Sequence, residues 1–164
     1  MCLWVRTAYH PDYQPLVAEE DLSVVKAIIV CKPDNSLYPS FFQDGPYMFL
    51  LKETYYTPFT QTPVVFDDEG KCVMKTENIG RDMHKDQFGA SIAKGIHSLS
   101  YEGVFGGYVR LDVHTYGGDE LMYFDAIIPK GTKYYAGQDF DYASEELIIY
   151  KYGGGERVKN AKKT

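Results

Sequence analysis

Apolar and polar residues alternate most regularly over residues 109–116. Successive side chains of a strand point to opposite faces, so this alternation predicts a half-buried strand. Residues 117–120 are turn-forming types, and the apolar stretch 121–128 predicts a returning strand. We therefore expect an antiparallel hairpin over 109–128. The first strand carries Val109, Leu111 and Val113 on its apolar face and Arg110, Asp112 and His114 on its polar face.

β-branched and aromatic runs predict further strands along the chain. The run at residues 24–30 is interrupted only by Lys26, and a turn at 32–35 follows it. Five or more strands are expected in total. Besides 24–30 and the hairpin, the expected strands are 47–51, 64–66, 71–74, 133–135 and 146–152.

Turn-forming residues separate several of these strands. Residues 67–70 form an acidic loop that would join 64–66 to 71–74 as a small hairpin. Pro129 and Gly131 occupy the preferred positions of a type I turn that starts at Ile128. The chain is expected to reverse at both places.

One segment has helical spacing. Phe88 and Ile92 are four residues apart, Asp86 is suited to cap a helix start, and Gly95 is suited to end it. These features predict a short helix over residues 86–94.

Together these patterns predict an α+β fold of predominantly antiparallel strands, a small β-rich domain or a partly open barrel with one or two short helices. A single domain should span residues 1–152, beginning with an N-terminal arm at 1–17 that Trp4 anchors. Residues 153–164 are rich in Gly and Lys and predict a flexible tail.

Composition and charge argue against some classes of function. The chain has 164 residues and a net charge of −6, and its basic cluster lies near the end at residues 157–163. Nucleic-acid affinity depends on clustered Lys and Arg, so no nucleic-acid partner is expected. No stretch approaches the roughly 20 apolar residues of a membrane span, and no signal peptide is visible, so no membrane association is expected.

Cysteine and histidine usage indicates no disulfide framework or metal centre. Cys2, Cys31 and Cys72 are far apart and lack Cys-x-x-Cys spacing, which indicates reduced thiols in a cytoplasm. The four histidines are scattered without a metal-binding motif. We expect neither a metal nor another cofactor.

His97 and Ser98 are the first candidate contact residues, because hydroxyl groups surround the histidine in the sequence. A Ser-His nucleophilic site would need a third orienting group, which no spacing identifies. This favours a structural or ligand-contacting histidine. The glycines at 103, 106 and 107 match no phosphate-binding loop and predict a loop or bulge.

An excess of aromatic residues suggests a binding surface. The sequence contains fifteen tyrosines but no recognisable set of catalytic residues. Aromatic side chains are enriched at binding hot spots. Tyr134, Tyr135, Phe140 and Tyr142 are the candidate surface. The alternative is that these side chains simply cover the sheet.

A set of segments spread over most of the chain carries a resemblance: Met1-Cys2-Leu3, residues 18–21, the aromatic segment 36–56, residues 95–98, residues 127–137, Tyr142-Ala143-Ser144 and residues 147–150. These segments resemble a little-characterised group of small proteins of gut bacteria and their phages. The resemblance implies an accessory protein of a phage or mobile element, acting in the host cytoplasm if phage-encoded, and it implies no particular activity. It departs between His97 and Phe124, where the predicted hairpin replaces a helical insert.

A weaker resemblance is to ADP-ribosyltransferase folds, through the aliphatic-Pro-x-Gly-Thr unit at residues 128–132. It would imply an NAD-using enzyme in which His97, Tyr101 and either Glu145 or Glu146 have the catalytic roles.

The leading hypothesis is a non-catalytic binding protein that engages a host protein or a small ligand, such as a nucleotide-like one, through its tyrosine-rich surface. The enzyme is the alternative. Exposed sheet edges could pair between copies, so a homodimer is compatible with the predicted fold.

Overall fold

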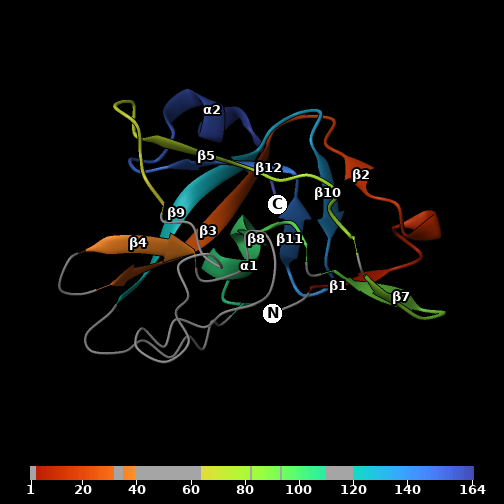
Figure 1. Cartoon of the computed structure of the whole chain (residues 1–164). Helices are drawn as coiled ribbons and strands as arrows, with labels where there is room; N and C mark the ends of the chain where they lie inside the picture. Colours follow the sequence, from red (N-terminus) through yellow and green to blue (C-terminus); the bar gives the residue numbers. More distant parts are fainter. Residues whose placement is uncertain (1–2, 32–34, 40–63, 82, 93, 110–119) are drawn as a thin grey trace.

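The computed structural model describes residues 3–31, 35–39, 64–81, 83–92, 94–109 and 120–164 (Figure 1). Strands dominate these residues and nearly all pair in antiparallel fashion, which confirms the predicted α+β class. The elements in chain order are β1 (Leu3–Arg6), the 3-10 turn η1 (Pro11–Tyr13), β2 (Leu16–Val17), β3 (Leu22–Cys31), β4 (Ser36–Pro39), β5 (Lys71–Lys75), β6 (His84–Lys85), β7 (Gly89–Ile92), β8 (Ile96–Ser100), α1 (Tyr101–Phe105), β9 (Glu120–Ile128), β10 (Lys133–Ala136), β11 (Asp141–Ser144), β12 (Glu146–Tyr150), α2 (Gly155–Asn160) and β13 (Lys162–Lys163).

β3 is the central strand of a ten-stranded sheet whose main path runs β2-β10-β11-β8-β3-β9-β12-β5. β9 pairs with one edge of β3 from Leu22 to Val30. The other edge is shared by β13, β8 and β4. The strand predicted at 24–30 is confirmed, and burial on both faces explains its almost unbroken apolar run.

The sheet bends at Glu145, the single residue between β11 and β12. The Glu145 amide donates to the Lys133 carbonyl at 3.0 Å, and the Glu145 carbonyl accepts from the Thr76 amide at 2.9 Å. The bend lets strands from both halves of the sheet share one core. Its buried members are Ala18, Leu22, Val24, Ile28, Val64, Met74, Ile96, Phe124, Ala126, Ile128, Leu147 and Ile149.

A small sheet in the order β1-β7-β6 forms a second core with residues of β10 and β11, Tyr135 and Ala143. β1 lies within the predicted N-terminal arm. Leu3 and Val5 are buried there while Trp4 is only half-buried, so the expected anchor, Trp4, is wrong. The reason is strand alternation, which points Leu3 and Val5 inward and Trp4 outward.

The helix predicted over 86–94 is wrong, because this segment turns from β6 into β7. The Asp86 carboxylate accepts from the amides of Phe88 and Gly89 at 2.7 and 3.0 Å, so it closes a turn instead of capping a helix. Phe88 is 68% exposed while Ile92 is fully buried. The two residues therefore share no apolar helical face.

Residues 153–164, predicted as a flexible tail, instead form α2 and β13. Val158 of α2 packs on Ile127, Ile148 and Tyr150, and β13 pairs in parallel with Leu22 and Ser23 of β3. Gly153, Gly154 and Gly155 all have positive φ, 88°, 67° and 56°. The glycine run is thus a left-handed turn that returns the chain to the sheet, a conformation other residues adopt only with strain.

Two turn predictions are refined. The loop at 67–70 is present, closed by the Asp67 carboxylate, but residues 64–66 form no strand, and β5 pairs with β12. The Thr132 amide bonds to the Pro129 carbonyl at 3.1 Å, with Gly131 at φ 86° in the third position. The turn therefore begins one residue later than expected and has the positive φ of type II.

Some predictions lie outside the described residues. The strand at 47–51, most of the turn at 32–35 and nearly all of the strand at 109–116, including His114, belong to this group. The strand at 121–128 is confirmed as part of β9, which pairs with β3 and β12.

Candidate functional site

The candidate contact residues lie on two faces of the main sheet. Tyr134 and Tyr135 are neighbours in β10, so their side chains point to opposite faces. The register pairs Ala136 with Tyr142, which places Tyr142 on the same face as Tyr134. Tyr135 lies on the other face with Ala143, and Ala143 pairs with His97. The predicted single surface is therefore divided.

Burial removes three of the candidates from any exposed surface. His97, Ser98 and Tyr135 are at most 4% exposed. Tyr135 is a core residue whose hydroxyl donates to the Tyr13 carbonyl at 2.7 Å. Tyr135 is therefore not part of an exposed surface, because the small sheet packs against it. The burial of His97 and Ser98 favours the structural role of the histidine over a ligand contact.

Phe140 is exposed but lies apart from the tyrosine pair. It is 42% exposed and occupies the turn before β11 with φ 61°. Its ring stacks on Tyr108, with centroids 5.2 Å apart and planes 16° apart. The Phe140 carbonyl accepts a hydrogen bond from the Ser100 amide, so Phe140 lies beside the start of α1.

Tyr134 and Tyr142 are the candidates that the structure brings together. Their ring centroids are 6.1 Å apart, and both rings are half-buried against the main core. Tyr134 also forms one wall of a pocket of about 470 Å³ at the β2 edge of the sheet. We call this the Tyr134 pocket. It is lined by Leu16, Val17, Ala18, Glu19, Glu20, Leu22, Tyr134 and Lys162.

Both apolar and charged groups line the Tyr134 pocket. Leu16 lies beside Tyr134 because β2 pairs with β10 there. Glu19 and Glu20 follow β2 and are exposed, while Lys162 is supplied by β13. Burial, and next the Glu19 carboxylate, raise the pKa of the Tyr134 hydroxyl, so Glu19 lies close enough to act on the phenol.

An ion pair fixes the segment that carries Lys162. Arg157 Nε lies 2.9 Å from Asp21 Oδ2, and the Lys130 amide donates to Asp21 Oδ1 at 2.9 Å. The Arg157 guanidinium is the main cause that lowers the pKa of Asp21. The Lys162 amide then donates to the Asp21 carbonyl at 2.8 Å. The predicted flexible tail is therefore part of the pocket wall, which sequence reasoning missed.

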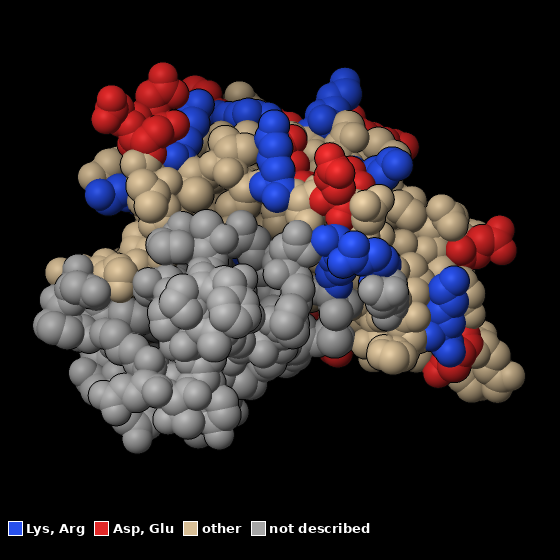
Figure 2. Space-filling view, in the orientation of Figure 1, with Lys and Arg blue, Asp and Glu red and all other residues tan. Residues whose placement is uncertain are grey.

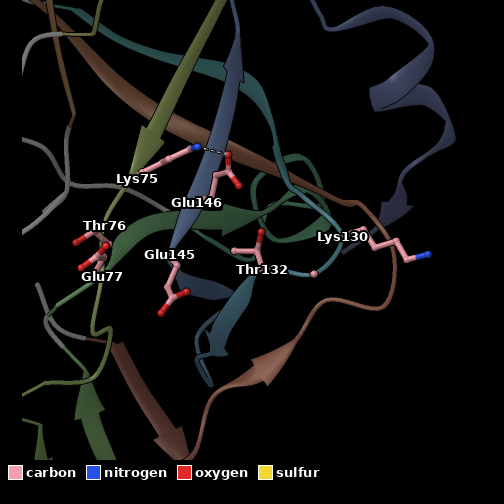
Figure 3. A pocket seen from close by; sticks show the side chains of 8 residues that line it. Lys75, Thr76, Glu77, Lys130, Thr132, Glu145 and Glu146 are labelled. Carbon is pink, nitrogen blue, oxygen red and sulfur yellow. Dashed lines mark ion pairs between the residues drawn. The ribbon is translucent and has the colours of Figure 1, made fainter.

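A second pocket, of about 510 Å³, has charged walls (Figure 3). Lys75 Nζ lies 3.7 Å from Glu146 Oε1, while Lys130 extends away from the other side chains. Glu77 and Glu145 add two more carboxylates. Basic and acidic side chains of the described residues are likewise interspersed on the face shown in Figure 2. This pocket has no apolar or aromatic side chain to hold an organic ligand.

A third pocket, of about 360 Å³, has aromatic lining that is already engaged. The Tyr13 hydroxyl donates to the Asp86 carbonyl, and Lys85 Nζ lies 5.0 Å from the centre of the Tyr13 ring. The Tyr135 hydroxyl is bonded to Tyr13 as well. Of these three pockets, the Tyr134 pocket has the most accessible apolar and aromatic wall.

The residues of the ADP-ribosyltransferase alternative do not all lie together. Ser144 pairs with Ile96, which places Glu145 and Glu146 beside the start of β8. Tyr101 follows the last residue of that strand. Neither Tyr101 nor His97 lines the pocket that contains the two glutamates.

Lys26 is a buried polar residue that sequence reasoning treated only as an interruption of a strand. It is fully buried between Val24 and Ile28, and Nζ donates to the His97 carbonyl. Burial lowers its pKa from 10.5 to about 7. β8 pairs with β3 up to Val25 and β4 begins at Ile28, so Lys26 lies where these partner strands diverge. A charged residue inside an apolar run was the available signal.

The described ranges contain neither a candidate metal cluster nor a membrane-spanning helix. No group of three or more His, Cys, Asp or Glu side chains there could hold a metal ion. No helix among them is long and apolar enough to cross a membrane. Cys72 is a half-buried free thiol whose pKa is raised by burial.

The carboxyl group of Asp141 should make the stability of the protein depend on pH. Burial, and next the Asp139 carboxylate, raise its pKa from 3.8 to about 6, and Oδ1 has no hydrogen-bond partner among the described residues. Between these two pKa values the folded chain binds the extra proton, so the free energy of unfolding should fall as pH rises from about 4 to 6. Asp141→Asn should remove this fall and stabilise the protein at neutral pH by about 2 kcal/mol.

Urea unfolding at a series of pH values measures this effect. Asp139→Asn, an exposed change two residues away, is the matched control and should retain most of the fall. Parallel pH profiles for the wild type and Asp141→Asn would show that the buried carboxylate is not responsible.

Comparison with known proteins adds no relative: the chain matches no family model, no curated protein and no solved structure. The two resemblances drawn from sequence motifs stay predictions.

Proposed function

We propose that this chain is a non-catalytic binding protein that holds a small organic ligand in the Tyr134 pocket. The observation that carries the proposal is that the aromatic ring of Tyr134 and four apolar side chains line one pocket. These apolar side chains are Leu16, Val17, Ala18 and Leu22. Pockets of several hundred Å³ with mostly apolar lining and a few charged groups are typical of small-molecule sites. The pocket volume of about 470 Å³ lies in that range.

Enzymatic function has less geometric support. Catalysis by the proposed NAD-using arrangement would need His97, Tyr101 and Glu145 or Glu146 around one substrate, whereas Tyr101 follows the end of β8 that is far from both glutamates. A general acid or base must also reach its substrate, and His97 is buried. The resemblance to phage-associated proteins favours an accessory role in a bacterial cytoplasm.

A host protein is the second candidate partner. Phe105, Tyr108 and Phe140 are exposed aromatic residues around α1, apart from the Tyr134 pocket. Aromatic residues are enriched at interface hot spots. A partner bound there would depend on Phe140 and not on Tyr134.

Native mass spectrometry of the protein purified gently from cells tests the proposed function. The wild type should carry a discrete small added mass. Tyr134→Ala should lose it, because removing the half-buried aromatic wall of the pocket weakens binding by about tenfold or more. Tyr142→Ala, which removes the ring beside Tyr134, should reduce occupancy.

Phe140→Ala is the matched control, because it removes an exposed ring of the same strand region and should leave the added mass in place. A wild type without added mass, or an added mass that survives both tyrosine changes, would contradict the proposal. A protein-sized mass lost only in Phe140→Ala would favour the host-protein candidate.

A further inference from the structure

The charged groups at the Tyr134 pocket are unequal in number. Glu19 and Glu20 each contribute a carboxylate, and Lys162 is the one cation among the lining residues. The neighbouring carboxylate, Asp21, is already neutralised by Arg157. The lining therefore has a net charge of −1, from two carboxylates and one ammonium group.

The excess negative charge lies beside the aromatic wall. Glu19 and Tyr134 line the same pocket, and burial, followed by the Glu19 carboxylate, raises the pKa of the phenol. The face of a phenol ring carries negative electrostatic potential and attracts cations. The ring and the Glu19 carboxylate thus favour the same sign of ligand charge.

The remaining lining is suited to an apolar body. Leu16, Ala18 and Leu22 line the pocket, and the last two belong to the main core. A ligand that fills such a space gains from removing apolar surface from water. A strongly hydrated inorganic cation would gain nothing from these side chains.

We propose that the pocket selects a small organic cation, an ammonium group with a compact apolar body, held between the Tyr134 ring and the Glu19 carboxylate. This rests on the proposed function and names its ligand class. A nucleotide is disfavoured, because its phosphates would face two carboxylates and find only Lys162 as a counter-charge.

Three probes of nearly equal shape test the sign of the charge. They are choline, the neutral alcohol in which a tert-butyl group replaces the trimethylammonium group, and the anion tert-butylacetate. In NMR titrations that follow the amides of Leu16, Ala18 and Leu22, choline should bind about three- to tenfold more tightly than the neutral alcohol. The anion should bind most weakly.

Charge variants provide the second half of the test. Glu19→Gln should weaken choline binding about threefold, and Lys162→Gln should strengthen it by a similar factor, because each removes one nearby charge. Glu69→Gln and Lys159→Gln remove exposed charges outside the pocket and should have no effect. Tyr134→Ala should reduce choline binding the most.

Each outcome separates the ligand class from the proposed function. Equal binding of choline and the neutral alcohol would overturn the cation proposal while leaving a binding pocket. Tighter binding of tert-butylacetate, or weaker choline binding in Lys162→Gln, would assign an anionic ligand instead. Failure of choline to shift the pocket amides would overturn the cation proposal, whereas the added mass and its loss in Tyr134→Ala decide the proposed function independently.

Discussion

Lys26→Met is expected to raise the free energy of unfolding at about pH 7 by roughly 2 to 4 kcal/mol. Burial lowers the pKa of Lys26 from 10.5 to about 7, so the fold is destabilised wherever the unfolded chain carries the charge. This shift corresponds to about 4 to 5 kcal/mol. The hydrogen bond from Nζ to the His97 carbonyl offsets about 1 to 2 kcal/mol of it. Methionine has similar length and no charge to bury.

The same shift predicts a pH dependence. Between about pH 7 and 10.5 the unfolded chain binds the proton that the folded chain has lost, so wild-type stability should rise with pH. Lys26→Met should lack this rise, and the two proteins should converge at the alkaline end. Chemical unfolding from neutral pH to about pH 9 measures both effects.

Lys159→Met is the matched control, because Lys159 is exposed on α2. It should change stability little at any pH. A Lys26→Met protein that is less stable than the wild type at neutral pH would contradict this prediction. It would show that the hydrogen bond of the amine, where β8 and β4 diverge, stabilises the fold by more than burial of the amine destabilises it.

His10→Ala is expected to destabilise the protein by about 3 kcal/mol. The ring is fully buried and lies 5.1 Å from the Tyr135 ring, measured between centroids. Nε2 accepts from the Ala136 amide at 3.2 Å, which leaves Nδ1 to donate to the Gln14 carbonyl at 3.0 Å. The alanine variant leaves a cavity and two unpaired backbone groups in the interior.

Urea unfolding measures this loss, and hydrogen exchange at the Ala136 amide locates it. His84→Ala is the control, since His84 is exposed in β6 and should contribute within about 0.5 kcal/mol. Equal effects at the two histidines would mean that the contacts of His10 do not stabilise the junction of the N-terminal segment with β10.

Local pattern was sufficient for the strands whose side chains have one consistent environment. β3 and β12 were predictable because their apolar runs are buried on both faces of the sheet. β10 was predictable because a turn follows it. The pattern failed at residues 86–94, where Phe88 and Ile92 have helical spacing but opposite environments. Spacing alone does not say whether two apolar residues are both buried.

The candidate site was predictable only in part. The aromatic density identified Tyr134 and Tyr142, but pairing of β10 with β11 decided that they, and not Tyr135, share a face. The position of Lys162 at the pocket could not be predicted from the sequence, because a glycine run followed by lysines is also typical of an unfolded terminus. Here Val158 and the Arg157–Asp21 pair hold that segment to β3.

The order of apolar and polar residues by itself determined that this protein is an antiparallel β-rich α+β domain, because side-chain alternation and turn chemistry act between near neighbours. Only the tertiary structure decided which tyrosine lines a pocket, that Lys26 lies in the core and that Glu19 and Lys162, far apart in the sequence, line the same pocket. Those features depend on strand register and on the bend at Glu145, which place distant segments together without leaving a local signal.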